Sequence, residues 1–166
     1  MAKRKLLKIQ DRKALFDIPT DEDSLMRHYS LSPADRLEIE VRRREHNRLG
    51  FAVQLCLMRY PGRALMANEI LPEAMLNYIA EQIGADPASF DLYARREETR
   101  MNHVARLLRY LEMRAATTED RRAALLAAIE AATVTDKGAT IATAIITTFR
   151  ERRVLLPAAN MIERMG

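Results

Sequence analysis

The chain has 166 residues, enough for one domain or two small linked ones, and 48% of them are hydrophobic, as in soluble globular proteins. Only five glycines occur, tryptophan is absent, and helix-forming residues dominate. A net charge of +4 permits a polyanionic partner. No apolar run approaches the roughly 18 to 20 residues that span a bilayer, and a single cysteine excludes an internal disulfide. We therefore expect a cytoplasmic protein with no membrane partner.

The N-terminal segment is basic. Residues 1–16 contain six basic residues and one acidic residue. A flexible basic arm can follow a DNA backbone or enter a minor groove, while a merely solvated tail is an equal alternative. The candidate DNA contacts in this arm are Lys3, Arg4 and Lys5. A short helix is predicted after it, from Glu22 to Tyr29, because Asp21 can cap its start.

The next predicted element leads into a buried central helix. Ser32 and Pro33 form a strong helix start, with an inward face of Ala34, Leu37 and Val41. The stretch from Leu49 to Met58 is apolar almost all the way round, which indicates a helix covered by its neighbours. Pro61 and Gly62 end it. Its basic flank supplies further DNA candidates: Arg42, Arg43, Arg44 and Arg48.

A helix-turn-helix pattern follows. A helix from Glu73 to Ile83 has the small Ala80 where a second helix would pack, and Gly84 suits a turn with positive φ. Asp86 and Pro87 can start the second helix, whose N-terminal part would enter a major groove. Helix–glycine–helix pairs are also common in all-α proteins that do not bind DNA. The candidates for base and phosphate contacts are Ser89, Arg95 and Arg96.

The last third of the chain predicts a second bundle of three helices. They run from about Glu97 to Glu112, from Glu119 to Ala132 and from Lys137 to Arg153. The second is expected to turn Leu125, Leu126 and Ile129 inward, and the third Ile141, Ile145 and Phe149. Lys137 and Thr140 would lie at the exposed start of the third helix, where they are candidate DNA contacts.

Together these elements predict an all-α fold of two tandem trihelical, helix-turn-helix-like bundles behind a basic N-terminal arm. Residues 1–30 would form the arm and short helix, 31–95 the first module and 96–157 the second. Residues 158–166 begin a further helix that simply stops, so we expect the chain to be part of a longer protein.

No catalytic or metal-binding pattern is present in the sequence. The three histidines lie far apart and have no carboxylate or cysteine at ligand spacing. There is no nucleophile elbow and no glycine-rich loop for phosphates. We therefore expect no enzyme activity, no cofactor and no metal in this segment.

Three stretches in combination carry a family resemblance: HNRLGFAVQLCLMRYPGR, IAEQIGADPASFDLYARREETRMNH and RRVLLPAANMIERM. With them the chain, from about Leu31 to Gly166, resembles the N-terminal portion of Tn-three family replicative transposases. The second stretch includes the pair Arg100 and His103, which we add to the candidate DNA contacts.

The resemblance implies an all-helical region of two helix-turn-helix-like modules that recognises the terminal inverted repeats of a bacterial transposon. A DDE-type, metal-dependent catalytic core would lie downstream, outside this chain. The implied partners are double-stranded DNA at transposon ends, the remainder of the transposase chain and, in the full protein, a second copy. The alternative is a non-catalytic helical domain for protein interaction or dimerisation.

The predicted central helix supplies a stability test. Replacing Leu55 or Leu57 by alanine should lower the free energy of unfolding by about 2 to 5 kcal/mol, because each change leaves a cavity in the core. Urea denaturation followed by circular dichroism measures the loss. A loss below about 1 kcal/mol at both positions would place this helix at the surface instead.

Overall fold

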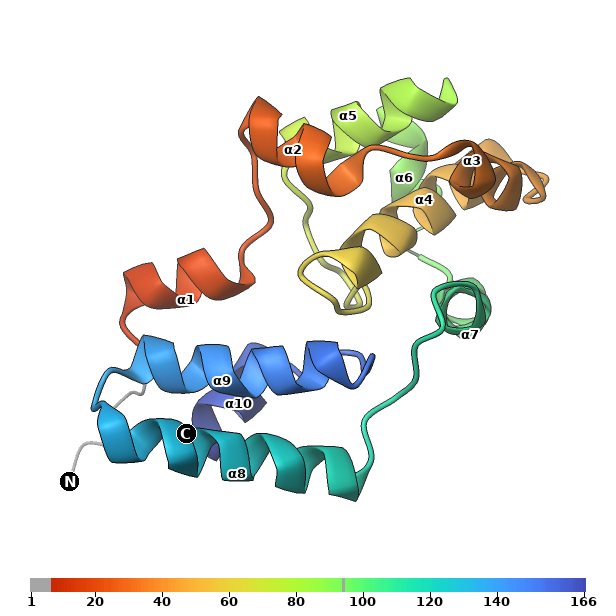
Figure 1. The fold of residues 1–166 in the computed structure, drawn as a ribbon. Coiled ribbons are helices and arrows are strands. Elements are labelled where there is room, and N and C mark those ends of the chain that lie inside the picture. The colour runs from red at the N-terminus through yellow and green to blue at the C-terminus, as the bar shows by residue number, and fades with distance from the viewer. Residues whose placement is uncertain (1–6, 94) are drawn as a thin grey trace. The chain divides into compact units, whose positions relative to one another are not determined.

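A computed structural model describes residues 7–93 and 95–166, and Figure 1 draws their path. The chain divides into two compact units. The unit that contains helix α4 (Glu45–Arg59), here the α4 unit, comprises residues 18–60, 64–93 and 95–111. The unit that contains helices α8 (Thr118–Val134) and α9 (Gly138–Glu151), here the α8–α9 unit, comprises residues 7–17, 61–63 and 112–166.

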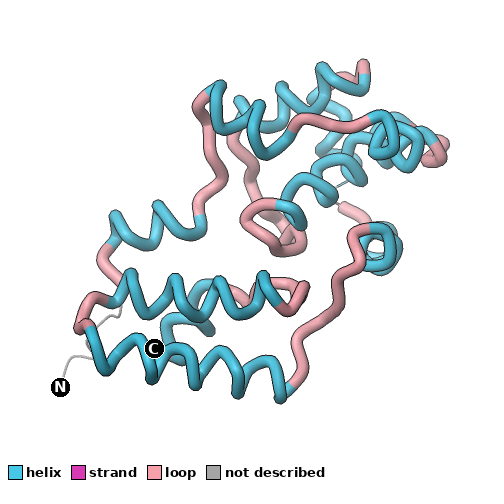
Figure 2. The backbone as a smooth tube through the Cα atoms, in the orientation of Figure 1, coloured by secondary structure: helices cyan, strands magenta, loops and turns pink. Residues whose placement is uncertain are grey.

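The predicted all-α fold is confirmed. Every regular element in the described part of the chain is helical, as Figure 2 shows, and the one β-type pairing there is an isolated bridge between Arg114 and Val154. Among the same residues, no helix is both long enough and apolar enough to cross a membrane.

The α4 unit is built around one buried helix, α4 (Glu45–Arg59). All ten residues from Leu49 to Met58 are buried, which confirms the central helix predicted from the sequence. It packs against every α-helix of its unit. These are α2 (Glu22–Tyr29), α3 (Pro33–Glu40), α5 (Glu73–Ile83), α6 (Phe90–Tyr93) and α7 (Glu97–Tyr110), and the short 3-10 helix η1 (Pro87–Ser89) precedes α6.

Helix α3 begins as predicted but turns a different face inward. Ser32 and Asp35 form a capping box at its start. Asp35 and Ile39 are the buried residues, whereas Leu37 and Val41 are 66% and 67% exposed, so the predicted inward face is wrong. The reason is that Asp35 has charged and hydrogen-bonding partners inside the unit, which hydrophobic periodicity does not reveal.

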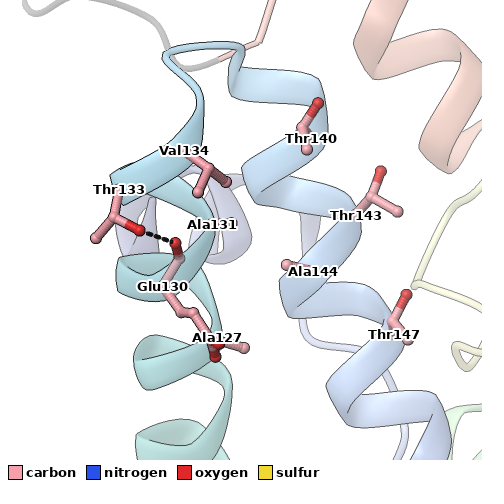
Figure 3. Close-up of a pocket in the computed structure, with 9 residues that line it drawn as sticks. All are labelled: Ala127, Glu130, Ala131, Thr133, Val134, Thr140, Thr143, Ala144 and Thr147. Carbon is pink, nitrogen blue, oxygen red and sulfur yellow. Dashed lines mark hydrogen bonds between the residues drawn. The ribbon is translucent and has the colours of Figure 1, made fainter.

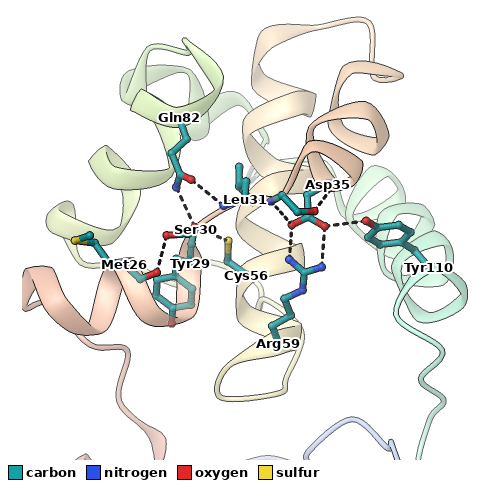
Figure 4. Close-up of polar contacts among 10 residues, drawn as sticks. Met26, Tyr29, Ser30, Leu31, Asp35, Cys56, Arg59, Gln82 and Tyr110 are labelled. Atoms are coloured by element: carbon teal, nitrogen blue, oxygen red, sulfur yellow. Dashed lines mark hydrogen bonds and ion pairs between the residues drawn. The ribbon is translucent and has the colours of Figure 1, made fainter.

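Asp35 joins three helices (Figure 4). Its carboxylate accepts two hydrogen bonds from Arg59 of α4, at 2.5 and 2.7 Å, and one from the Tyr110 hydroxyl of α7 at 2.8 Å. The backbone N–H of Ser32 donates to it at 2.9 Å. Burial would raise the pKa of Asp35, but these bonds outweigh it and lower the pKa to about 2. The carboxylate therefore stays charged in the fold.

Gly50 lets α6 approach the backbone of α4. A Cβ at this position would lie 2.1 Å from Cγ of Tyr93, far inside van der Waals contact. Tyr93 is fully buried. The glycine is therefore needed for this close approach, although glycine inside a helix is otherwise unfavourable.

The α8–α9 unit is centred on an antiparallel helix pair, α8 (Thr118–Val134) and α9 (Gly138–Glu151), seen side by side in Figure 1. Its other helices are α1 (Ile9–Phe16) and α10 (Ala159–Met165). The predicted inward face of α9 is confirmed, because Ile141, Ile145 and Phe149 are buried.

The predicted inward face of α8 is wrong. Ala124 and Ala128 are buried, while Leu125, Leu126 and Ile129 are 42%, 66% and 55% exposed. Alanine at the contact lets the two helix backbones approach closely, so the large side chains that fill the core come from α9. Amphipathic periodicity favoured the leucines because they are the more hydrophobic residues.

Asp120 anchors the start of α8. It is fully buried and caps the helix together with Thr117, and it accepts hydrogen bonds from Arg114 and from Arg152, the latter at 2.7 Å. These bonds from Arg114 and Arg152 hold the pKa of the Asp120 carboxyl well below its usual range. The carboxylate thus links the segment before α8 to the end of α9.

The division into units differs from the predicted boundaries at residues 30/31 and 95/96. Helix α7 packs on α4, so residues 97–110 lie with the first unit rather than starting the second. Helix α1 packs on α9, so residues 7–17 lie with the C-terminal helices. Both differences arise because the contacts cross the predicted boundaries, which sequence-local patterns do not encode.

Gly50→Ala should destabilise the protein despite the better helix propensity of alanine. The propensity gain is at most about 1 kcal/mol, whereas forcing a methyl group into a packed contact costs about 1 to 3 kcal/mol or more. Thermal denaturation would measure the loss. Adding Tyr93→Leu should recover part of it, since the two changes share one contact. A Gly50→Ala variant as stable as the wild type would rule out the close approach.

Asp35→Asn should lower the free energy of unfolding at neutral pH by about 1 to 3 kcal/mol, because it weakens bonds between charged partners. The pKa of Asp35 lies near 2, below its ordinary 3.8, so its stabilisation is complete above pH 4 and is lost as the pH falls towards 2. Wild type should therefore lose more stability than the variant over that range. Asp91→Asn, at an exposed site, is the control.

Candidate nucleic-acid interface

Two exposed arginines lie in the turn that joins α3 to α4. Arg43 and Arg44 are both exposed, and Arg44 is the N-cap residue of α4. Arg48, one turn into the helix, donates from Nη1 to the backbone carbonyls of Arg42 at 3.3 Å and of Arg43 at 3.1 Å. Arg48 therefore shapes the turn, while Arg43 and Arg44 present their charge to solvent.

Arg42 packs inward. Its guanidinium carbon lies 4.1 Å from the centre of the Phe51 ring, a cation–π contact. Its Nε is buried without a hydrogen-bond partner, and burial lowers the pKa of the guanidinium. Because this side chain covers Phe51, a change at Arg42 would disturb packing as well as charge.

Two further arginines precede helix α7, and one of them lies near His46 of α4. Arg95 and Arg96 are exposed, and Arg96 is the N-cap residue of α7. Burial lowers the pKa of His46, and the positive charges of Arg44 and Arg96 lower it further. Both guanidinium groups therefore lie close enough to His46 to act on it.

We call the exposed arginines Arg43, Arg44, Arg95 and Arg96 the arginine surface. The structure thus brings together two of the predicted DNA-contacting segments. His46 completes the group and was missed from the sequence. The available signal was its position two residues after Arg44 at a helix start.

The helix-turn-helix prediction is confirmed for the first helix, for the turn and for the start of the second helical segment, where Asp86 caps η1 by accepting from the Ala88 N–H. Ala80 is buried and Gly84 adopts a left-handed conformation, with φ +66°. The second helical segment is short, since η1 and α6 end at Tyr93, before the arginines. Ser89 lies half-buried, and its hydroxyl donates to the Asp86 carbonyl at 2.7 Å. The segment is also tied to α4, because the Asp86 N–H donates to Glu45 at 2.7 Å.

Arg100 and His103 lie in the core of the α4 unit, only 9% and 7% exposed. The Tyr93 hydroxyl lies 3.0 Å from Nδ1 of His103 and accepts a bond from Gln54 at 3.5 Å. Burial lowers the pKa of His103 to about 4, so the imidazole is neutral at physiological pH. Both side chains therefore take part in the packing of the α4 unit, and we leave them out of the candidate interface.

Lys137 and Thr140 belong to the α8–α9 unit, where both are exposed at the start of α9. Beside them a groove of about 610 Å³ lies between α8 and α9 (Figure 3). Its lining is mainly alanine and threonine and includes Thr140 but no cation: Ala127, Glu130, Ala131, Thr133, Val134, Thr140, Thr143, Ala144 and Thr147. This composition suits apolar contact better than phosphate binding.

The remaining predicted contacts, Lys3, Arg4 and Lys5, lie outside the described residues. Within residues 7–93 and 95–166, no group of three or more histidine, cysteine or acidic side chains is arranged to hold a metal ion.

Comparison with known proteins gives a consistent family. The chain is 40% identical to the transposase for transposon Tn501 of Pseudomonas aeruginosa, over 99% of this chain and 17% of that protein. It is 38% identical to the transposase for transposon Tn21 of Escherichia coli, with the same shares. For the transposase for transposon Tn1546 of Enterococcus faecium, the identity is 33% over 98% of this chain and 16% of the relative.

These relatives confirm the resemblance to Tn-three family transposases predicted from the sequence. The chain spans about a sixth of the length of the curated relatives it matches. The family model described as "Domain of unknown function (DUF4158)" matches residues 6–166. Because that match covers nearly the whole sequence, the chain belongs to the DUF4158 family.

Proposed function

We propose that this chain binds double-stranded DNA at the terminal inverted repeats of a transposon, as a non-catalytic part of a transposase. The observation that supports the proposal is the arginine surface, in which Arg44 and Arg96, exposed cations from two distant segments, both lower the pKa of His46 and have Arg43 and Arg95 as their exposed chain neighbours. The similarity to transposases supports a role in DNA transposition.

The arginine surface suits the DNA backbone. Guanidinium groups bind phosphates through paired hydrogen bonds, and the N-terminal ends of α4 and α7 carry partial positive charge beside Arg44 and Arg96. Phosphate contacts fix the orientation of a protein on the duplex, whereas contacts to base edges give sequence preference. Ser89 stays a prediction for such a base contact, and Lys137 and Thr140 stay predicted DNA contacts.

Catalysis is assigned to the remainder of the transposase in this proposal. The chain matches only 16–17% of the relatives' length, and a DDE-type, metal-dependent core would lie in the part it does not cover. The segment itself would need no cofactor. Its partners would be the transposon end and the rest of the transposase, in the cytoplasm of a bacterial cell.

A second candidate is a helical interaction domain without DNA recognition. It is favoured by one observation, the exposed aliphatic side chains of α8. The arginines of the α4 unit would then be ordinary solvated charges.

Arg95→Ala/Arg96→Ala should weaken binding to a duplex carrying the cognate inverted repeat. The slope of log affinity against log salt should also fall by about 0.9 for each phosphate that the variant no longer neutralises. Fluorescence anisotropy at several salt concentrations measures both effects. Arg43→Ala/Arg44→Ala should act alike, whereas Arg42 is left intact because it packs on Phe51.

The matched control is Arg27→Ala/Arg109→Ala, which removes the same charge from exposed positions of the same unit. If this control weakens binding as much, net charge rather than the arginine surface is responsible. Equal affinity of the wild type for the inverted repeat and for a scrambled duplex at moderate salt would overturn end recognition by this chain.

A further inference from the structure

Helix α8 is apolar on two opposite faces. Ala124 and Ala128 face the core of the unit and are at most 2% exposed. Leu125, Leu126 and Ile129 lie on the other side of the helix and are 42–66% exposed. We call these three side chains the outer face of α8. Three adjacent exposed aliphatic side chains on one helix favour an interaction surface over a purely solvated one.

Unpaired charges of opposite sign flank the outer face. Arg122 lies one turn before Leu126 and Glu130 lies one turn after it. Neither side chain has an ion-pair or hydrogen-bond partner in the part of the chain that the structure describes. The surface therefore carries a basic end, an aliphatic middle and an acidic end.

We propose that α8 pairs antiparallel with α8 of a second copy of this chain, around a two-fold axis near Leu126. Residues 122 and 130 are equidistant from 126, so each Arg122 would meet Glu130 of the other copy. A two-fold interface uses the same patch on both copies and must be self-complementary, as this one is. A parallel pairing would instead place Arg122 against Arg122 and Glu130 against Glu130.

This inference is independent of the proposed DNA binding. The outer face lies in the α8–α9 unit, whereas the arginine surface lies in the α4 unit. DNA is a poor occupant of the outer face, because a phosphate backbone would meet three aliphatic side chains and a carboxylate.

Charge reversal tests the pairing of the 166-residue chain by sedimentation equilibrium over a concentration series. Arg122→Glu and Glu130→Arg should each weaken the dimer about tenfold, because each change opposes two pairs of like charges. The double variant Arg122→Glu/Glu130→Arg should restore it. Circular dichroism checks that the variants stay folded.

Two further variants test the aliphatic contact. Leu126→Glu should give a monomer, whereas Leu37→Glu, at a position that is also 66% exposed but in the α4 unit, should leave the dimer unchanged. Leu126→Cys should form a disulfide-linked dimer under mild oxidation by dissolved oxygen, and Leu37→Cys should not. The native Cys56 does not interfere, since it is buried and burial raises the pKa of its thiol to about 12.

A wild-type chain that stays monomeric at concentrations up to about 1 mM would overturn the proposal. A dimer that the double charge reversal does not restore would overturn the antiparallel register. A dimer that forms only on DNA and ignores positions 122 and 130 would equally contradict it.

Discussion

The burial of α4 on all sides is the constraint on which the α4 unit depends. A helix with ten consecutive buried residues needs neighbours on every side, and α2, α3, α5, α6 and α7 supply them. Gly50 allows one of these neighbours to lie against the backbone. Asp35 constrains how these helices are oriented, because its hydrogen bonds to Arg59 and Tyr110 fix α3 and α7 relative to α4.

The same constraint explains where the unpaired positive charge lies. A helix with an apolar middle can carry cations only at its ends, so the arginines around α4 lie in the turn before it and at its last residue. Arg95 and Arg96 directly precede α7. Two arginines point into the unit and stabilise its packing. Arg42 makes a cation–π contact with Phe51, and Arg59 donates hydrogen bonds to Asp35. Among the cations that stay exposed, Arg43, Arg44, Arg95 and Arg96 form the arginine surface, on which the proposed function rests.

The core of the α8–α9 unit is packed in a different way. Small alanines on α8 face large side chains on α9, and the buried Asp120 joins the helix ends through Arg114 and Arg152. This arrangement leaves the larger aliphatic side chains of α8 at the surface. The two units therefore present surfaces of different chemistry, one cationic and one aliphatic with balanced charges, which suits two kinds of partner.

The sequence alone determined the helical fold, the buried stretch from Leu49 to Met58 and the start of α3 at Ser32, because each follows from local periodicity or capping. It also predicted both arginine segments. Only the tertiary structure decided that Asp35 rather than Leu37 faces inward, that His103 is buried beside Tyr93, and that α8 buries alanines. Those outcomes depend on partners distant in sequence, and hydrophobicity along a chain records how apolar a residue is but not which surface it will meet.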